Sequence, residues 1–275
     1  MRRAVVVWAA AYGGLRIWFA TGHAFEWKLP GDDLLVPNWV AAIGCLVAAL
    51  AVIRVWPRLL WALAAGWLAA AAFLLLDLVA MVLPGLGIPF DLPGMLSRLG
   101  AVAGAVLLGR LARAHQSEAK PWPHWVPVAG ASLAVAGCLT RLAAQVVVGF
   151  DQMPYDGNLS VLLFEGGFVL AGTLLPFLLV HRIGRYFPRW LLLLPGFTLG
   201  AGITAYFTVG LIQMIANAVR GEPVYGDVGL PDSFFWVAVP AYIVWGAGLT
   251  VAARGYQFAT RKATDSECDL QITQR

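Results

Sequence analysis

Apolar stretches of nearly membrane-spanning length recur along the whole of this chain. They are bounded by proline, glycine and charged residues, and they cover residues 4–21, 39–53, 59–83, 99–111, 126–149, 160–180, 190–219 and 233–253. A membrane-crossing helix needs about 20 mostly apolar residues. Backbone amides inside lipid must be hydrogen-bonded within their own element, so these stretches predict helices. We therefore expect an all-α polytopic integral membrane protein with eight transmembrane helices.

The composition excludes several other classes of protein. The residues AVILMFWYC make up 60% of the 275 positions and DEKR only 12%, whereas soluble domains carry about 25% charged residues. This excludes a disordered chain, a coiled coil and a secreted disulfide scaffold. The three cysteines, Cys45, Cys138 and Cys268, have no metal-ligand spacing. Nucleotide-binding, zinc-protease and hydrolase motifs are missing from the sequence, so we expect no cofactor and no metal.

The distribution of charge predicts the orientation in the membrane. With a cytoplasmic N-terminus, the basic residues that fall inside are Arg2, Arg3, Arg54, Arg58, Arg110, Arg113, Lys120, Arg182, Arg185, Arg189, Arg254, Arg261, Lys262 and Arg275. Only Lys28, Arg98 and Arg220 fall outside, and most acidic residues lie on that outer side. The positive-inside rule then places both termini in the cytoplasm. The net charge of +4 reflects this topology, and we expect no nucleic-acid partner.

Short motifs that recur in the same order in the two halves of the chain indicate an internal duplication. The motif RVWPR at 54–58 is matched by RYFPR at 185–189, after the second and the sixth apolar stretch. A spacing of nine residues from arginine to phenylalanine also recurs, at 16–25 and at 141–150. Four helices per half is an even number, so the copies should point the same way, as in parallel-repeat transporters.

We accordingly divide the chain into three parts. Residues 1–125 form a first four-helix repeat, 126–253 a second, and 254–275 a polar, disordered cytoplasmic tail. The stretch GGLRIWF at 13–19 resembles, in a general way, small bacterial integral-membrane domains, and this resemblance implies no activity.

Four ionisable residues lie inside the apolar stretches: Arg16, Asp77, Arg141 and Glu165. A charge in the hydrocarbon costs about 2.5 to 3.5 kcal/mol on insertion scales, so such residues normally face the protein interior. At 1.5 Å per residue all four lie about 9 to 13 Å below the outer ends of their helices. They form one candidate layer, in which we expect Arg141 to pair with Glu165, and Arg16 with Asp77.

Other polar residues are secondary candidates for the same layer. His23, near Arg16 and Glu26, would serve as a proton relay, although a single loop histidine is more often merely exposed. Gln213 and Asn217 lie one turn apart in the seventh apolar stretch and would face the layer if that helix turns toward it.

Small residues indicate where helices approach closely. The pairs at 100–104 and 196–200 are both Gly-x-x-x-Gly patterns. Pro195 also interrupts the seventh stretch, so this long helix is either broken around a cavity or simply packed.

Three functions fit these observations. The first is binding or transport of a small solute or proton through the charged layer. The second is a non-catalytic scaffold or accessory subunit that docks a membrane-protein partner or a second copy of the chain. A third is an enzyme acting on outer-leaflet lipid, with Asp77 or Glu165 as general base, but we lean against an enzyme. In each case the expected location is the bilayer of the inner, cytoplasmic membrane.

Overall fold

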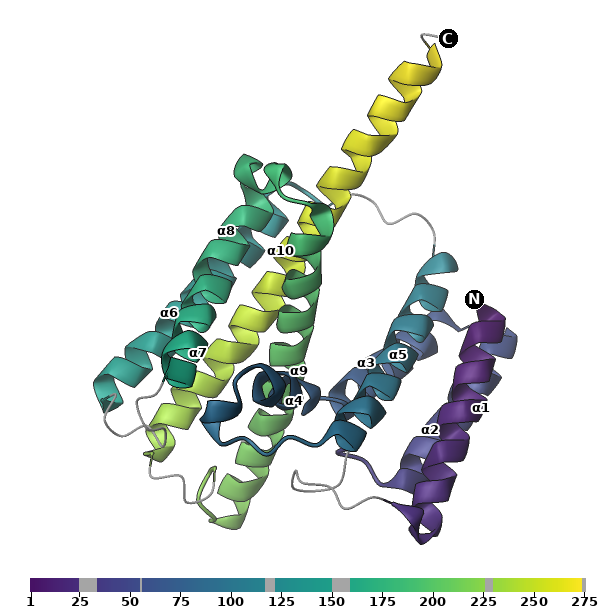
Figure 1. Ribbon diagram of the computed structural model, residues 1–275, viewed down its shortest axis with the longest axis vertical. Coiled ribbons are helices and arrows are strands. Elements are labelled where there is room, and N and C mark those ends of the chain that lie inside the picture. The colour runs from purple at the N-terminus through teal and green to yellow at the C-terminus, as the bar shows by residue number, and fades with distance from the viewer. Residues whose placement is uncertain (25–33, 55, 117–121, 150–158, 226–229, 274–275) are drawn as a thin grey trace. The chain divides into compact units, whose positions relative to one another are not determined.

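The structure is a computed structural model that describes residues 1–24, 34–54, 56–116, 122–149, 159–225 and 230–273, with side chains described as far as residue 260. Every described element is helical, as Figure 1 shows. The chain divides into two compact units, Met1–Ala119 and Lys120–Arg275. Each unit is described below by itself.

The described part of the first unit contains five α-helices. Their bounds are α1 Arg2–Trp18, α2 Asn38–Arg54, α3 Pro57–Ala70, α4 Leu74–Val82 and α5 Leu92–Ala114. A short π-helix, η1 (Phe19–His23), continues α1, and a 3-10 turn, η2 (Pro84–Leu86), follows α4. Proline occupies the first or second position of α3 and α5, where its missing N–H would be unbonded in any case.

The second unit is built around two long helices. Its α-helices are α6 Trp125–Val148, α7 Leu159–Val169, α8 Leu175–Val180, α9 Arg189–Arg220 and α10 Asp232–Thr273. The π-helical turn η3 (Leu170–Leu174) joins α7 to α8, and the 3-10 helix η4 (Arg182–Tyr186) precedes α9.

Six of the described helical segments are long and apolar enough to cross a membrane. They are Arg2–His23, Leu92–Ala114, Trp125–Val148, Leu159–Val180, Arg189–Arg220 and Asp232–Thr260. A seventh is obtained if the bent pair α3 and α4 is one span, whereas α2 is apolar but shorter, with 17 residues. The chain is therefore an all-helical protein with the spans of a membrane protein.

The break in a predicted span lies in the third stretch and not in the seventh. Residues 59–83 were expected to form one helix, but α3 and α4 meet at an angle of 43°. The backbone between them makes tighter turns, in which Ala72 N–H donates to Ala69 O and Leu74 N–H donates to Ala71 O. By contrast, α9 runs without interruption through Pro195.

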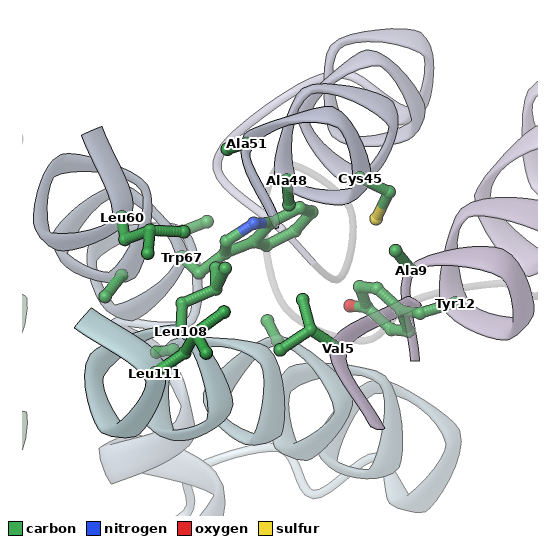
Figure 2. Packing of buried hydrophobic residues seen from close by; sticks show 14 of the residues in the cluster. Val5, Ala9, Tyr12, Cys45, Ala48, Ala51, Leu60, Trp67, Leu108 and Leu111 are labelled. Atoms are coloured by element: carbon green, nitrogen blue, oxygen red, sulfur yellow. The ribbon is translucent and has the colours of Figure 1, made fainter. Parts of the chain in front are cut away.

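The core of the first unit joins α1, α2, α3 and α5 (Figure 2). Trp67 of α3 points into its centre, between Ala48 of α2 and Leu108 of α5. Trp8 of α1 lies beside Trp67, with ring centres 5.4 Å apart, and its indole N–H donates to Gly100 O of α5 at 2.8 Å. The Gly-x-x-x-Gly pattern at 100–104 therefore provides close helix packing, as expected, by receiving aromatic rings from α1.

We expect Gly104→Ala to destabilise the first unit by about 1 to 3 kcal/mol, because its methyl group would overlap the indole ring of Trp8. The matched control is Gly66→Ala in α3, where an added Cβ has open space around it. There the better helix propensity of alanine should leave stability unchanged or slightly higher. Thermal unfolding in detergent compares the two variants, and equal melting temperatures would contradict the packing described here.

Glycines also bring α10 close to α6 and α9. A Cβ added to Gly246 of α10 would lie 2.7 Å from the Gly200 carbonyl oxygen of α9. On α6, a Cβ added to Gly137 would lie 2.5 Å from the Ala241 carbonyl oxygen. A Cβ on Gly196 would lie 3.0 Å from that of Ala253. The pattern at 196–200 is thus a packing surface for α10.

The helix α10 continues past residue 253, where we expected the polar tail to begin. Tyr256 is buried, and its hydroxyl donates to Gly184 O at 2.9 Å. This contact with η4 stabilises the part of α10 that extends beyond the apolar stretch. The side chains of 261–275, which make up most of the predicted tail, lie outside the described residues.

Candidate functional site

In the second unit, Arg141 of α6 and Glu165 of α7 form a bidentate ion pair. Nη1 and Nη2 of the arginine each donate to one carboxylate oxygen at 3.0 Å. This confirms the predicted pairing of the two residues. The parallel fork is the geometry in which guanidinium and carboxylate satisfy each other best.

Aromatic residues complete the surroundings of Arg141. Its Nε donates to the Tyr242 hydroxyl at 2.9 Å, and its guanidinium lies 4.7 Å from the centre of the Phe168 ring. All three nitrogens of the guanidinium therefore have partners, and the ring face adds a cation–π contact. Glu165 is 23% exposed, so this pair lies at the edge of the helix packing.

The buried carboxylate of the first unit has a different partner from the one expected. Asp77 of α4 pairs with Arg98 of α5, with Nη1 and Oδ2 at 2.5 Å. Both side chains are 0% exposed. The predicted pairing of Asp77 with Arg16 is wrong, because α5 begins at Leu92, before the predicted stretch 99–111, and carries Arg98 into the interior.

A second carboxylate lies beside this pair. Asp91, the residue before α5, is 4% exposed. A Cβ added to Gly94 would lie 2.8 Å from Asp91 Oδ2 and 3.3 Å from Arg98 Nη1, so both side chains pack against this glycine. Asp77, Asp91 and Arg98, called here the triad, carry two negative charges and one positive charge.

Several polar atoms of the triad are buried without a hydrogen bond. Within the described part of the chain, Asp77 Oδ1, Asp91 Oδ2 and the Nε and Nη2 atoms of Arg98 have no partner. A buried polar group left unbonded costs about 1 to 3 kcal/mol. The triad thus offers both acceptors and donors to a small polar guest.

Arg16 belongs to a neighbouring polar network that joins three helices. Its Nη1 donates to Asn38 Oδ1 of α2 at 2.9 Å, and its Nη2 donates to the Tyr12 hydroxyl at 2.7 Å. Nη2 also donates to the hydroxyl of Ser97, which precedes Arg98 on α5. The network and the triad are therefore connected through consecutive residues of one helix.

Arg98 and Asp91 were not among the expected members of the layer, because the apolar pattern assigns both residues to an outer loop, yet both are buried. A signal was present: Asp91 is followed by Leu92 and Pro93, and an acidic residue before a proline in the first turn is typical of a helix start. In the second unit, Gln145 was also not among the expected members; it is fully buried one turn from Arg141 and donates to Gly149 O at 3.2 Å.

The secondary candidates lie outside these clusters. His23 is exposed and stacks on Trp18 at 3.8 Å between ring centres, and its proposed partner Glu26 lies outside the described residues. Gln213 is exposed, and Asn217 donates to Val224 O at 3.4 Å. The structure shows no contact of either residue with Arg141 or Glu165 among the described interactions.

Among the described residues, no group of three or more His, Cys, Asp or Glu side chains is arranged to hold a metal ion. In comparisons with protein families, curated proteins and solved structures, no match to this chain was found.

Proposed function

We propose that this protein is a multi-pass membrane protein that binds or transfers a small solute or proton through its buried charged layer. The observation that carries the proposal is the triad, in which three fully buried or nearly buried charged side chains retain unbonded polar atoms. Charged residues inside a membrane protein are costly, and they commonly mark solute or proton pathways.

The chemistry of the triad favours a proton, a water molecule or a small cationic or polar solute. Two carboxylates beside one guanidinium leave one negative charge for a proton or a cation to neutralise. Asp91 Oδ2 and Arg98 Nη1 both lie against Gly94, so a proton or a small polar solute bound at this point would meet an acceptor and a donor together. The hydroxyl groups of Tyr12 and Ser97 extend the same polar region toward Arg16.

We further propose that the chain forms eight spans in two parallel four-helix repeats. Both termini would lie in the cytoplasm, and the protein would reside in the inner, cytoplasmic membrane. The positive-inside rule supports this orientation. The occurrence of a buried arginine near the outer end of α1 and of α6, Arg16 and Arg141, supports the duplication.

Proton movement tests the proposal directly. Purified protein is reconstituted into liposomes that enclose a pH-sensitive dye, and a potassium diffusion potential is applied with valinomycin. We expect the wild type to acidify the lumen faster than protein-free liposomes, and Asp91→Asn to abolish the difference. This substitution keeps the Arg98–Asp77 ion pair and removes only the second carboxylate. The matched control Asp232→Asn changes an exposed residue at the start of α10 and should behave as the wild type.

Access of water to the triad provides a second readout. Asp91→Cys is combined with Cys268→Ser, which leaves Cys45 and Cys138, both buried, as the only other thiols. A charged, water-soluble thiol reagent should label the new cysteine in intact liposomes. No proton movement together with no labelling would refute both the proton and the solute forms of the proposal.

A scaffold or accessory subunit is the second candidate. It is favoured by Gly166 and Gly167, which follow the partly exposed Glu165 on α7 and have open space around them. Such a surface lets another helix approach closely. A stable complex with another membrane protein after gentle solubilisation would support this candidate, and a strict monomer would count against it.

A further inference from the structure

A polar cavity lies at the end of the second unit where α8 ends and α9 begins. Its volume is about 360 Å³, within the range of about 300 to 1,000 Å³ that is usual for small-molecule sites. The polar residues that line it are His124, His181, Arg182, Arg185, Tyr256 and Thr260. They come from the start of α6, from η4 and from α10, and Figure 1 shows the connection after α8 beside α10.

The described residues that line the cavity include two arginines and no carboxylate. Arg182 and Arg185 are exposed, and neither forms an ion pair within the described part of the chain. Because a guanidinium stays protonated at all ordinary pH values, this cavity attracts anions.

The walls of the cavity are held in place by specific contacts. The Tyr256 hydroxyl donates to Gly184 O at 2.9 Å, which joins α10 to η4. A side chain at position 184 would overlap the Leu178 carbonyl oxygen, so η4 lies directly against α8. The His181 ring stacks on Phe177, and its Nδ1 accepts a long hydrogen bond of 3.5 Å from Ile183 N–H. In that tautomer Nε2 carries the proton and can donate to a guest.

Exposed tryptophans place the cavity at the depth of the lipid headgroups. Trp125 begins α6 and Trp190 is the second residue of α9, and both are about two-thirds exposed, at 67% and 66%. Tryptophans at the ends of spans mark the membrane interface. Positive-inside topology assigns this end to the cytoplasm, where anionic lipids supply phosphate groups.

We propose that this cavity binds a negatively charged phosphate group, presented either by an anionic phospholipid or by a free phosphate. Paired arginines match phosphate oxygens through charge-assisted hydrogen bonds, and basic pockets between membrane helices are known to hold lipid headgroups. The residues of this cavity are not those of the charged layer, so the phosphate proposal can be tested independently of the proposed function.

The test uses the full-length protein in a neutral maltoside detergent. Its melting temperature is measured against increasing phosphatidylglycerol, phosphatidylcholine and inorganic phosphate. The variant is Arg182→Gln with Arg185→Gln, which changes exposed residues and should leave the fold intact. The matched control is Arg54→Gln with Arg58→Gln, which removes the same charge from the related RVWPR motif at 54–58, also from exposed side chains.

We expect phosphatidylglycerol, and not phosphatidylcholine, to raise the melting temperature of the wild type. The apparent affinity should fall about tenfold or more in the Arg182/Arg185 variant and stay unchanged in the control. If inorganic phosphate alone raises the melting temperature and displaces phosphatidylglycerol, the source is a free phosphate. If neither anion stabilises the wild type, or if both double variants lose affinity equally, the proposal is wrong.

Discussion

Replacing Arg98 with methionine is expected to lower the free energy of unfolding by about 3 to 5 kcal/mol, which is the usual cost of breaking a buried ion pair. The substitution leaves Asp77 and Asp91 together in the interior without their guanidinium. Asp77→Asn should cost less, because Arg98 keeps Asp91 nearby. The double variant Asp77→Asn with Arg98→Met should recover part of the loss. Reversible unfolding in mixed detergent micelles measures all three.

Arg110→Met provides the control for this experiment. It makes the same chemical change in the same helix α5, but Arg110 is exposed. Its effect should stay within about 0.5 kcal/mol. If Arg98→Met proves no more damaging than Arg110→Met, then Arg98 and Asp77 are not the buried pair described here.

The Arg141–Glu165 pair should give the second largest effect. We expect Arg141→Met and Glu165→Gln each to cost about 2 to 3 kcal/mol, with a coupling energy of about 2 kcal/mol in the double variant. These expected losses of stability are smaller than that for Arg98→Met, because Glu165 is 23% exposed and its carboxylate can rotate toward the protein surface when its partner is removed. Tyr242→Phe, which removes only the partner of Arg141 Nε, should cost about 1 kcal/mol. The measurement is the same unfolding assay.

The outcome also bears on function. If each single variant loses much stability and the double variant recovers it, the pair stabilises the packing of α6 against α7. That result would favour the scaffold candidate for the second unit. If both single variants and the double variant unfold like the wild type, the pairing contributes nothing to stability. The charges would then have to be retained for binding or transfer.

Much of the fold class could be predicted from the sequence. Apolar stretches of this length leave only helices, because every amide in lipid needs a partner inside its own element. The pairing of Arg141 with Glu165 could also be predicted, since the helical rise places both at a similar depth in consecutive helices. Eight spans, a duplication and cytoplasmic termini remain predictions.

The tertiary structure alone decided which charges meet in the first unit. Depth along a helix follows from counting residues, but the direction in which a side chain points depends on how the helices pack. Arg98 entered the interior because α5 starts at Leu92, and the bend of 43° between α3 and α4 accompanies the pairing of Asp77 with it. The basic cavity in the second unit likewise depends on Tyr256 holding α10 against η4. These features arise from contacts between residues far apart in the chain, which local hydrophobic patterning does not specify.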